Sequence, residues 1–132
     1  TISASEVLQE SLLANIDEAL GLALIEARAF QDRSDSAQRL TNSLEIFDPS
    51  LVSVFKGLVT QSFSMLTSIE DLAKRREIDL LGSTGEEIEF SPKYFETLGA
   101  LRGNRGVIRR PAIVKKTAQG AIGAVVKKGM VE

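Results

Sequence analysis

Side chains that could do acid–base or metal chemistry gather at one place in this sequence. Glu86, Glu87 and Glu89 lie together, and Glu87 and Glu89 would share one face of a strand. Paired carboxylates can act as general acid and base or bind a divalent cation. No second acidic cluster lies close in sequence to complete a metal site. A solvated strand face that limits aggregation is the favoured interpretation, so we predict no catalytic residue and no metal ligand.

The basic side chains are concentrated at the end of the chain. Residues 107–132 hold six bases and one acid, whereas residues 1–48 hold nine acids and three bases. An acidic protein partner, nucleic-acid phosphates or a merely solvated face would each account for this distribution. No aromatic residue follows Phe95, which disfavours stacking on single-stranded nucleic acid.

Residue types that are missing narrow the function further. The 132 residues include no His and no Cys, which removes the commonest general base at neutral pH and every thiolate site. We therefore expect a non-enzymatic binding protein without a cofactor. No apolar run approaches the roughly 20 residues of a membrane span, and no signal-peptide pattern is present, so a cytoplasmic location is expected.

A long helix is predicted at the start of the chain. Ser3 and Glu6 have the spacing of a capping box, and apolar residues three and four apart predict a helix over residues 5–30. The polar residues 31–36 predict a loop, or a break with a restart at residue 35 or 36. The stripe is Leu8, Leu12, Leu13, Ile16, Leu20, Ala23, Leu24 and Ala27.

The most regular helical pattern follows Asp48 and Pro49. Asp before Pro is typical of an N-cap followed by the first helical residue, where the missing N–H of Pro costs nothing. We expect this helix to end at residues 76–78. Its apolar positions are Leu51, Val52, Phe55, Leu58, Val59, Phe63, Leu66, Ile69, Leu72 and Ala73.

Short strands and turns are predicted after the second helix. The glycines in residues 82–85 indicate a turn, and residues 87–90 alternate as in a half-buried strand. A short turn or helix is predicted at residues 94–98, and an exposed loop at 99–106.

The end of the chain is predicted to form two further strands. Residues 107–117 form the first, with an edge or bulge at Pro111. A tight turn at residues 120–123 leads to the last strand over residues 124–131.

This order of elements indicates the fold class. Helices come first and strands after, which predicts a segregated α+β fold. We expect a helical region at residues 1–80 and a small β domain at residues 81–132.

Four short motifs, spread over most of the chain, match the pattern of one protein family. Gly57 precedes the pair Met65-Leu66 in the second helix, and Phe90-Ser91-Pro92 is followed by Glu96. Residues 110–114 read Arg-Pro-Ala-Ile-Val, and residues 12–20 begin with Leu-Leu and contain Asp-Glu-Ala-Leu. In these motifs the chain resembles the GrpE family, although Ser91 and Phe95 stand where that family usually has Asp and His.

The resemblance implies a stress-response co-chaperone. GrpE proteins dimerise through a helical bundle, and their β domain wedges against the ATPase domain of a DnaK-type chaperone, which opens the nucleotide cleft and speeds ADP release. It implies a homodimer and a bundle core of Leu12, Ile16, Leu20, Leu24, Phe55, Leu58, Val59, Phe63 and Leu66. The implied partner-binding residues are Gly57, Phe90, Pro92, Tyr94, Glu96, Arg102, Arg105, Arg109, Arg110, Lys115 and Lys116.

Other interpretations of the same residues stay open at this point. At least two of Phe90, Tyr94 and Phe95 are expected to form a small core under the strands, and Gly57 could mark a close approach of two helices. A helical adaptor for another protein, or a nucleic-acid-associated protein using the basic end, are the alternative functions.

Overall fold

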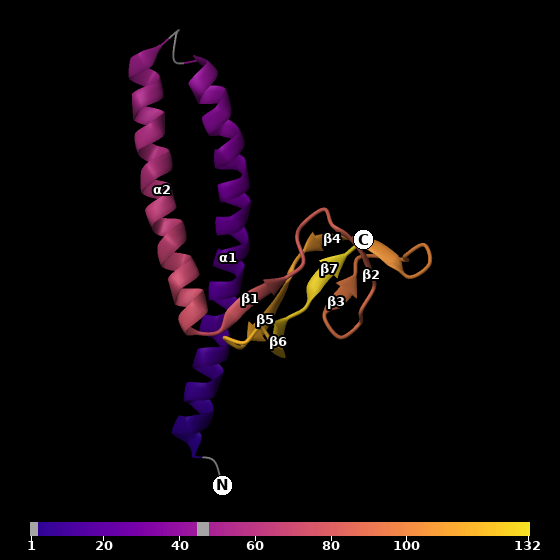
Figure 1. Cartoon of the computed structure of the whole chain (residues 1–132). Helices are drawn as coiled ribbons and strands as arrows, with labels where there is room; N and C mark the ends of the chain where they lie inside the picture. Colours follow the sequence, from indigo (N-terminus) through magenta and orange to yellow (C-terminus); the bar gives the residue numbers. More distant parts are fainter. Residues whose placement is uncertain (1–2, 45–47) are drawn as a thin grey trace.

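The computed structural model describes residues 3–44 and 48–132, which form a helical hairpin followed by a β-rich region (Figure 1). Two helices come first and all strands come after them, so the predicted α+β fold class is confirmed. Figure 1 shows the strands gathered beside the lower half of the hairpin, with the N-terminal part of the first helix continuing beyond the second.

Helix α1 (Ala4–Leu44) begins where the sequence predicts but ends later. The predicted capping box is present: the Glu6 amide donates to Ser3 Oγ at 3.2 Å, and the Ser3 amide donates to the Glu6 carboxylate at 3.3 Å. The predicted loop or break at residues 31–36 is wrong. Ser34 is buried and its hydroxyl donates to the Gln31 carbonyl oxygen, so it is satisfied within the helix and does not end it.

Helix α2 (Pro49–Arg75) runs antiparallel to α1. Its predicted start is confirmed, because the Asp48 carboxylate accepts a hydrogen bond from the Leu51 amide at 3.2 Å. Val52, Val59, Leu66 and Ala73, spaced seven apart, are the buried residues of α2. They form the side of α2 that packs on α1. Among the described residues, neither helix is apolar over a long enough stretch to cross a membrane.

The described residues after α2 form short strands. They are β1 (Ile78–Leu81), β2 (Glu87–Glu89), β3 (Phe95–Thr97), β4 (Arg105–Arg110), β5 (Ala112–Lys116), β6 (Ile122–Lys127) and β7 (Gly129–Val131). One sheet has the order β1-β5-β6, and the other has the order β2-β4-β7-β3. All pairings are antiparallel except that of β3 with β7.

A single bent hairpin ties the two sheets together. Its first arm is β4 and β5, interrupted at Pro111, and its second arm is β6 and β7, interrupted at Lys128. β5 pairs with β6 in one sheet, whereas β4 pairs with β7 in the other. The single strand predicted over residues 107–117 is interrupted at Pro111, which separates β4 from β5, and the ladder register shifts just before it, between Ile108 and Arg110.

Several strand predictions need correction. The sequence does not predict β1 (Ile78–Leu81): it predicts a helix that ends at residues 76–78, whereas Glu77, with a φ of 57°, turns the chain into a strand. β3 (Phe95–Thr97) replaces the predicted short turn or helix, since β7 offers it a partner far along the chain. The predicted loop at residues 99–106 ends early because β4 begins at Arg105, and the predicted final strand is split at Lys128.

Two hydrophobic cores lie on the two sides of β5. Ala112 and Val114 belong to the core inside the β-rich region, together with Phe95, Ile108 and Val131. Ile113, between them, belongs to a second core with Leu24, Ala73 and Ile78. Because neighbouring side chains of a strand point to opposite faces, β5 joins the β-rich region to the helices. The boundary predicted at residue 80 falls inside β1.

Candidate functional site

A buried carboxylate lies where the helices meet the three-stranded sheet. Asp17 of α1 accepts hydrogen bonds from Arg76 Nε at 2.9 Å and Nη2 at 3.1 Å. Lys115 Nζ of β5 is 2.9 Å from Asp17 Oδ2, the oxygen that also accepts from Arg76 Nη2, and it donates to the Arg76 carbonyl oxygen at 2.6 Å. The Asp17 side chain is only 7% exposed. These three residues, the Asp17 triad, connect α1, the end of α2 and β5.

The electrostatics of the triad favour the charged state of Asp17. Burial by itself raises the pKa of this carboxyl, but hydrogen bonds and charge from Arg76 and Lys115 outweigh burial and hold its pKa below the ordinary value of 3.8. The same contacts raise the pKa of Arg76, chiefly through its hydrogen bond to Asp17. Asp17 is therefore ionised at neutral pH, and both of its oxygens have partners from its own chain.

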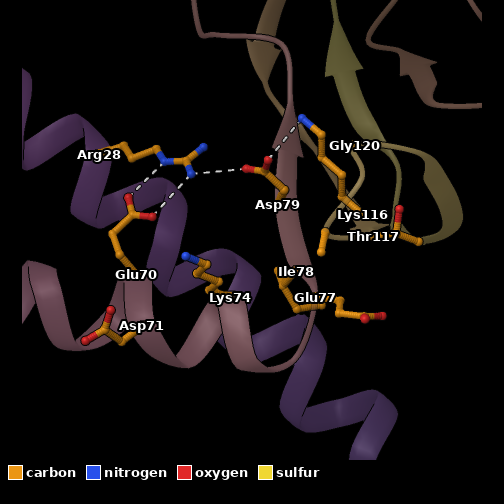
Figure 2. Close-up of a pocket in the computed structure, with 11 residues that line it drawn as sticks. Arg28, Glu70, Asp71, Lys74, Glu77, Ile78, Asp79, Lys116, Thr117 and Gly120 are labelled. Carbon is orange, nitrogen blue, oxygen red and sulfur yellow. Dashed lines mark hydrogen bonds and ion pairs between the residues drawn. The ribbon is translucent and has the colours of Figure 1, made fainter.

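A second network of ion pairs lies around Asp79 of β1. Arg28 of α1 bridges Glu70 of α2 and Asp79 of β1, each at 3.1 Å, and Lys116 of β5 reaches Asp79 at 3.4 Å (Figure 2). Burial tends to raise the pKa of Asp79, but the amide of Leu80 and the two cations lower it overall. These residues line a cleft of about 500 Å³ together with Asp71, Lys74 and Glu77, so the lining carries four acids and three bases.

The predicted basic surface is thus largely engaged within the chain. Besides Lys115 and Lys116, Lys127 contacts Glu18 of α1 at 2.6 Å. Arg105 pairs with Glu87 at 3.1 Å and Arg109 pairs with Glu132 at 2.8 Å, and all four of these side chains are more than half exposed. Exposed pairs of this kind are worth little, so Arg105 and Arg109 stay available to a partner, whereas Lys115 serves the fold.

The predicted partner-binding segment at residues 90–96 runs from the end of β2, at one edge of the four-stranded sheet, to β3 at the opposite edge. Phe90 and Tyr94 are half-buried against the β core, as the core interpretation predicts, while Pro92 and Glu96 are exposed. Arg102 is exposed in the loop before β4.

Gly57 lies apart from the other predicted partner-binding residues, in the middle of α2. A Cβ added there would meet nothing within 4 Å, so no close helix approach exists at Gly57 within the chain.

The predicted bundle core divides into residues that the chain buries and residues that it leaves exposed. Leu24, Val59 and Leu66 are buried, and Leu20 and Phe63 are half-buried. Leu24 is covered by the β-rich region as well as by α2. The residues that remain at least one-third exposed are Leu12, Ile16, Phe55 and Leu58.

Sequence reasoning missed the residues that join the two regions. Asp17, Arg28 and Gly21 all lie on α1 and face elements more than 40 positions away in the sequence. A glycine in the middle of a long helical pattern was the one local signal, because such a glycine often marks a close packing contact. Among the described residues, no three acidic side chains lie close enough to hold a metal ion.

Comparison of the chain with known proteins gives no match. No family model, no curated protein and no solved structure matches it.

Proposed function

We propose that this protein is a dimeric nucleotide exchange factor for a DnaK-type chaperone. The proposal rests on the GrpE-like motifs together with one structural observation. The helices contact only the three-stranded sheet to any extent, through β1, β5 and β6. The four-stranded sheet extends away from the hairpin (Figure 1). Glu96 lies in its edge strand β3, Pro92 in the segment between β2 and β3, and Arg102 in the loop before β4.

This arrangement suits a mechanical role. A factor that opens a nucleotide cleft must bind the open state of the ATPase domain more tightly than the closed state. A wedge can do this only if it is firmly held, and the Asp17 triad and the contact between Lys127 and Glu18 hold the β-rich region on α1. One sheet is thus anchored and the other is presented to a partner, with no chemical group needed at the nucleotide.

The exchange proposal is tested by release of fluorescently labelled ADP from the DnaK-type chaperone of the same cell. We expect saturating protein to speed release by about 5–150-fold, the usual range of coupling between two sites. The double variant Glu96→Arg/Arg102→Glu should abolish most of this acceleration, because both side chains are exposed on the projecting part. Arg39→Glu, an exposed change on α1 far along the hairpin, is the control. An unchanged release rate with the unmodified protein would refute the proposal in favour of an adaptor function.

The dimer is suggested by a row of mainly apolar residues on α2 that the described part of the chain leaves largely uncovered. Leu51, Phe55, Leu58, Ser62, Met65, Ile69 and Leu72 follow one another at alternating spacings of four and three. This outer seam has the period of a coiled coil and lies beside the buried series that begins at Val52. Leu51, Leu58 and Met65 are each at least 60% exposed. An apolar cleft of about 500 Å³ between the helices adjoins it, lined by Leu40, Leu51, Phe55 and Leu58 among others.

A change in the outer seam should therefore separate the subunits. We expect the unmodified protein to sediment at twice the 14.3 kDa of one chain, and Leu58→Glu to sediment as a single chain, because a charge in the seam would lose its hydration. Thr60→Glu, exposed on another side of α2, should leave the mass unchanged. Equal masses for the unmodified protein and Leu58→Glu would contradict a dimer formed through this seam.

A further inference from the structure

A cleft separates α1 from the four-stranded sheet, and neither ion-pair network fills it. Its volume is about 680 Å³, within the range of sites that bind small molecules or a few peptide residues. One wall is α1, the other is the end of β4, and Thr84 of the loop between β1 and β2 closes one side. The lining residues are Leu22, Ile25, Glu26, Ala29, Phe30, Arg33, Thr84, Arg109 and Arg110.

The helical wall of the cleft is apolar and partly uncovered. Leu22, Ile25, Ala29 and Phe30 recur at helical spacings on one side of α1. Leu22 is 37% exposed and Phe30 is 44% exposed, so a large apolar area faces the cleft without a partner from the described part of the chain. Such a surface favours an aliphatic or aromatic side chain from outside.

Arginines supply most of the charge around this wall. Arg33 forms no ion pair with any described residue. Arg110 donates through Nη2 to the Lys128 carbonyl oxygen at 3.1 Å, while its Nε is buried without an acceptor. Arg109 is paired only with the exposed Glu132. Against these three cations the lining offers one carboxylate, Glu26, so the cleft has an excess of positive charge.

We propose that this cleft binds a short acidic peptide segment in which a carboxylate lies next to an aromatic or aliphatic residue. The apolar side chain would lie on Leu22 and Phe30, and the carboxylate would accept hydrogen bonds from Arg33 and Arg110. Guanidinium groups pair with carboxylates through two parallel hydrogen bonds, which gives direction as well as affinity. The inference does not depend on exchange activity, because its ligand is defined by this cleft alone.

Two features favour a peptide over other anions. A nucleic-acid duplex keeps its bases stacked inside, so it would present phosphates to the arginines and leave Leu22 and Phe30 uncovered. A fatty acid would need an enclosed apolar channel for its chain, whereas here Arg33, Glu26 and Thr84 interrupt the apolar wall. A peptide with alternating acidic and apolar side chains matches both walls at once.

The test is fluorescence anisotropy with two labelled peptides and the full chain. The probe is fluorescein-Gly-Ser-Asp-Phe-Leu-Asp-Gly-amide, and the matched peptide has Asn in place of both Asp. We expect the Asp peptide to bind with a Kd in the tens of micromolar and the Asn peptide at least tenfold more weakly. Added salt should weaken the Asp peptide alone, since its charges are screened.

Variants of α1 assign the binding to the cleft. Arg33→Gln should weaken the Asp peptide about tenfold, and Phe30→Ser should weaken both peptides, whereas Arg39→Gln on the same helix should change neither. All three positions are exposed, so the fold should tolerate these changes. Equal affinity for the two peptides, equal affinity of Arg33→Gln and the unmodified protein, or no binding at millimolar protein would overturn the proposal. Binding of decanoate, measured by isothermal titration calorimetry, without binding of the Asp peptide would overturn it in favour of a lipid ligand.

Discussion

Replacing Gly21 by valine is expected to lower the free energy of unfolding by about 3 kcal/mol. Gly21 is buried in α1, and a Cβ there would overlap Ile113 of β5 at three of its side-chain carbons. Ile113 is itself fully buried between Leu24, Ala73 and Ile78, so it has no room to move aside. The small size of Gly21 is what lets β5 approach α1.

Gly57→Val is the matched control for this prediction. Gly57 is also in a helix, but a side chain there meets nothing within 4 Å. Valine is somewhat better than glycine inside a helix, so unfolding should shift by less than about 0.5 kcal/mol and toward higher stability. Urea denaturation of both variants at one protein concentration gives the comparison, because stability of a dimer depends on concentration. Equal effects at the two glycines would contradict the close packing of β5 on α1.

Asp17→Asn is expected to lower the free energy of unfolding by about 2–3 kcal/mol at neutral pH. The asparagine keeps the shape of the side chain but removes the charge that Arg76 and Lys115 share. The two cations are partly exposed, so water compensates some of the loss and the effect stays below that of a fully buried pair. Asp35→Asn, an exposed change on the same helix, should have almost no effect.

The effect of Asp17→Asn on the free energy of unfolding should depend on pH, because the pKa of Asp17 is lowered in the folded protein. The folded pKa of Asp17 is below 3.8, its usual value in an unfolded chain. Its contribution is therefore complete above about pH 5 and is lost as the pH falls below 3.8 toward the folded pKa. Urea denaturation at pH 7 and at pH 3 should show the gap between the unmodified protein and Asp17→Asn shrinking at the lower pH. A constant gap would mean that Asp17 contributes by packing and not by charge.

The charge distribution has a structural explanation that the sequence did not reveal. The acidic start and basic end of the chain meet in the fold, where Asp17 contacts Lys115 and Glu18 contacts Lys127. A basic end suggested a partner surface, but two of its four lysines, Lys115 and Lys127, hold the β-rich region on α1. Net charge by segment cannot distinguish these roles, because it carries no information on which segments become neighbours.

Local signals predicted local structure well. The capping box at Ser3 and the N-cap at Asp48 are both present, because each depends on residues a few positions apart. The break predicted at residues 31–36 and the missed β1 have one cause. Contacts with distant elements outweigh weak local preferences. Packing on α2 keeps residues 31–36 helical, and pairing with β5 makes residues 78–81 a strand.

The apolar stripe of α2 shows most clearly where sequence information ends. Periodicity by itself determined that residues 49–75 form an amphipathic helix, and composition determined that the chain has no thiol or imidazole chemistry. Only the tertiary structure divided that stripe into a side covered by α1, which includes Val59, and an uncovered seam, which includes Leu58. The reason is geometric: adjacent positions differ by about 100° around a helix, and the position of the neighbouring helix decides which of the two is buried.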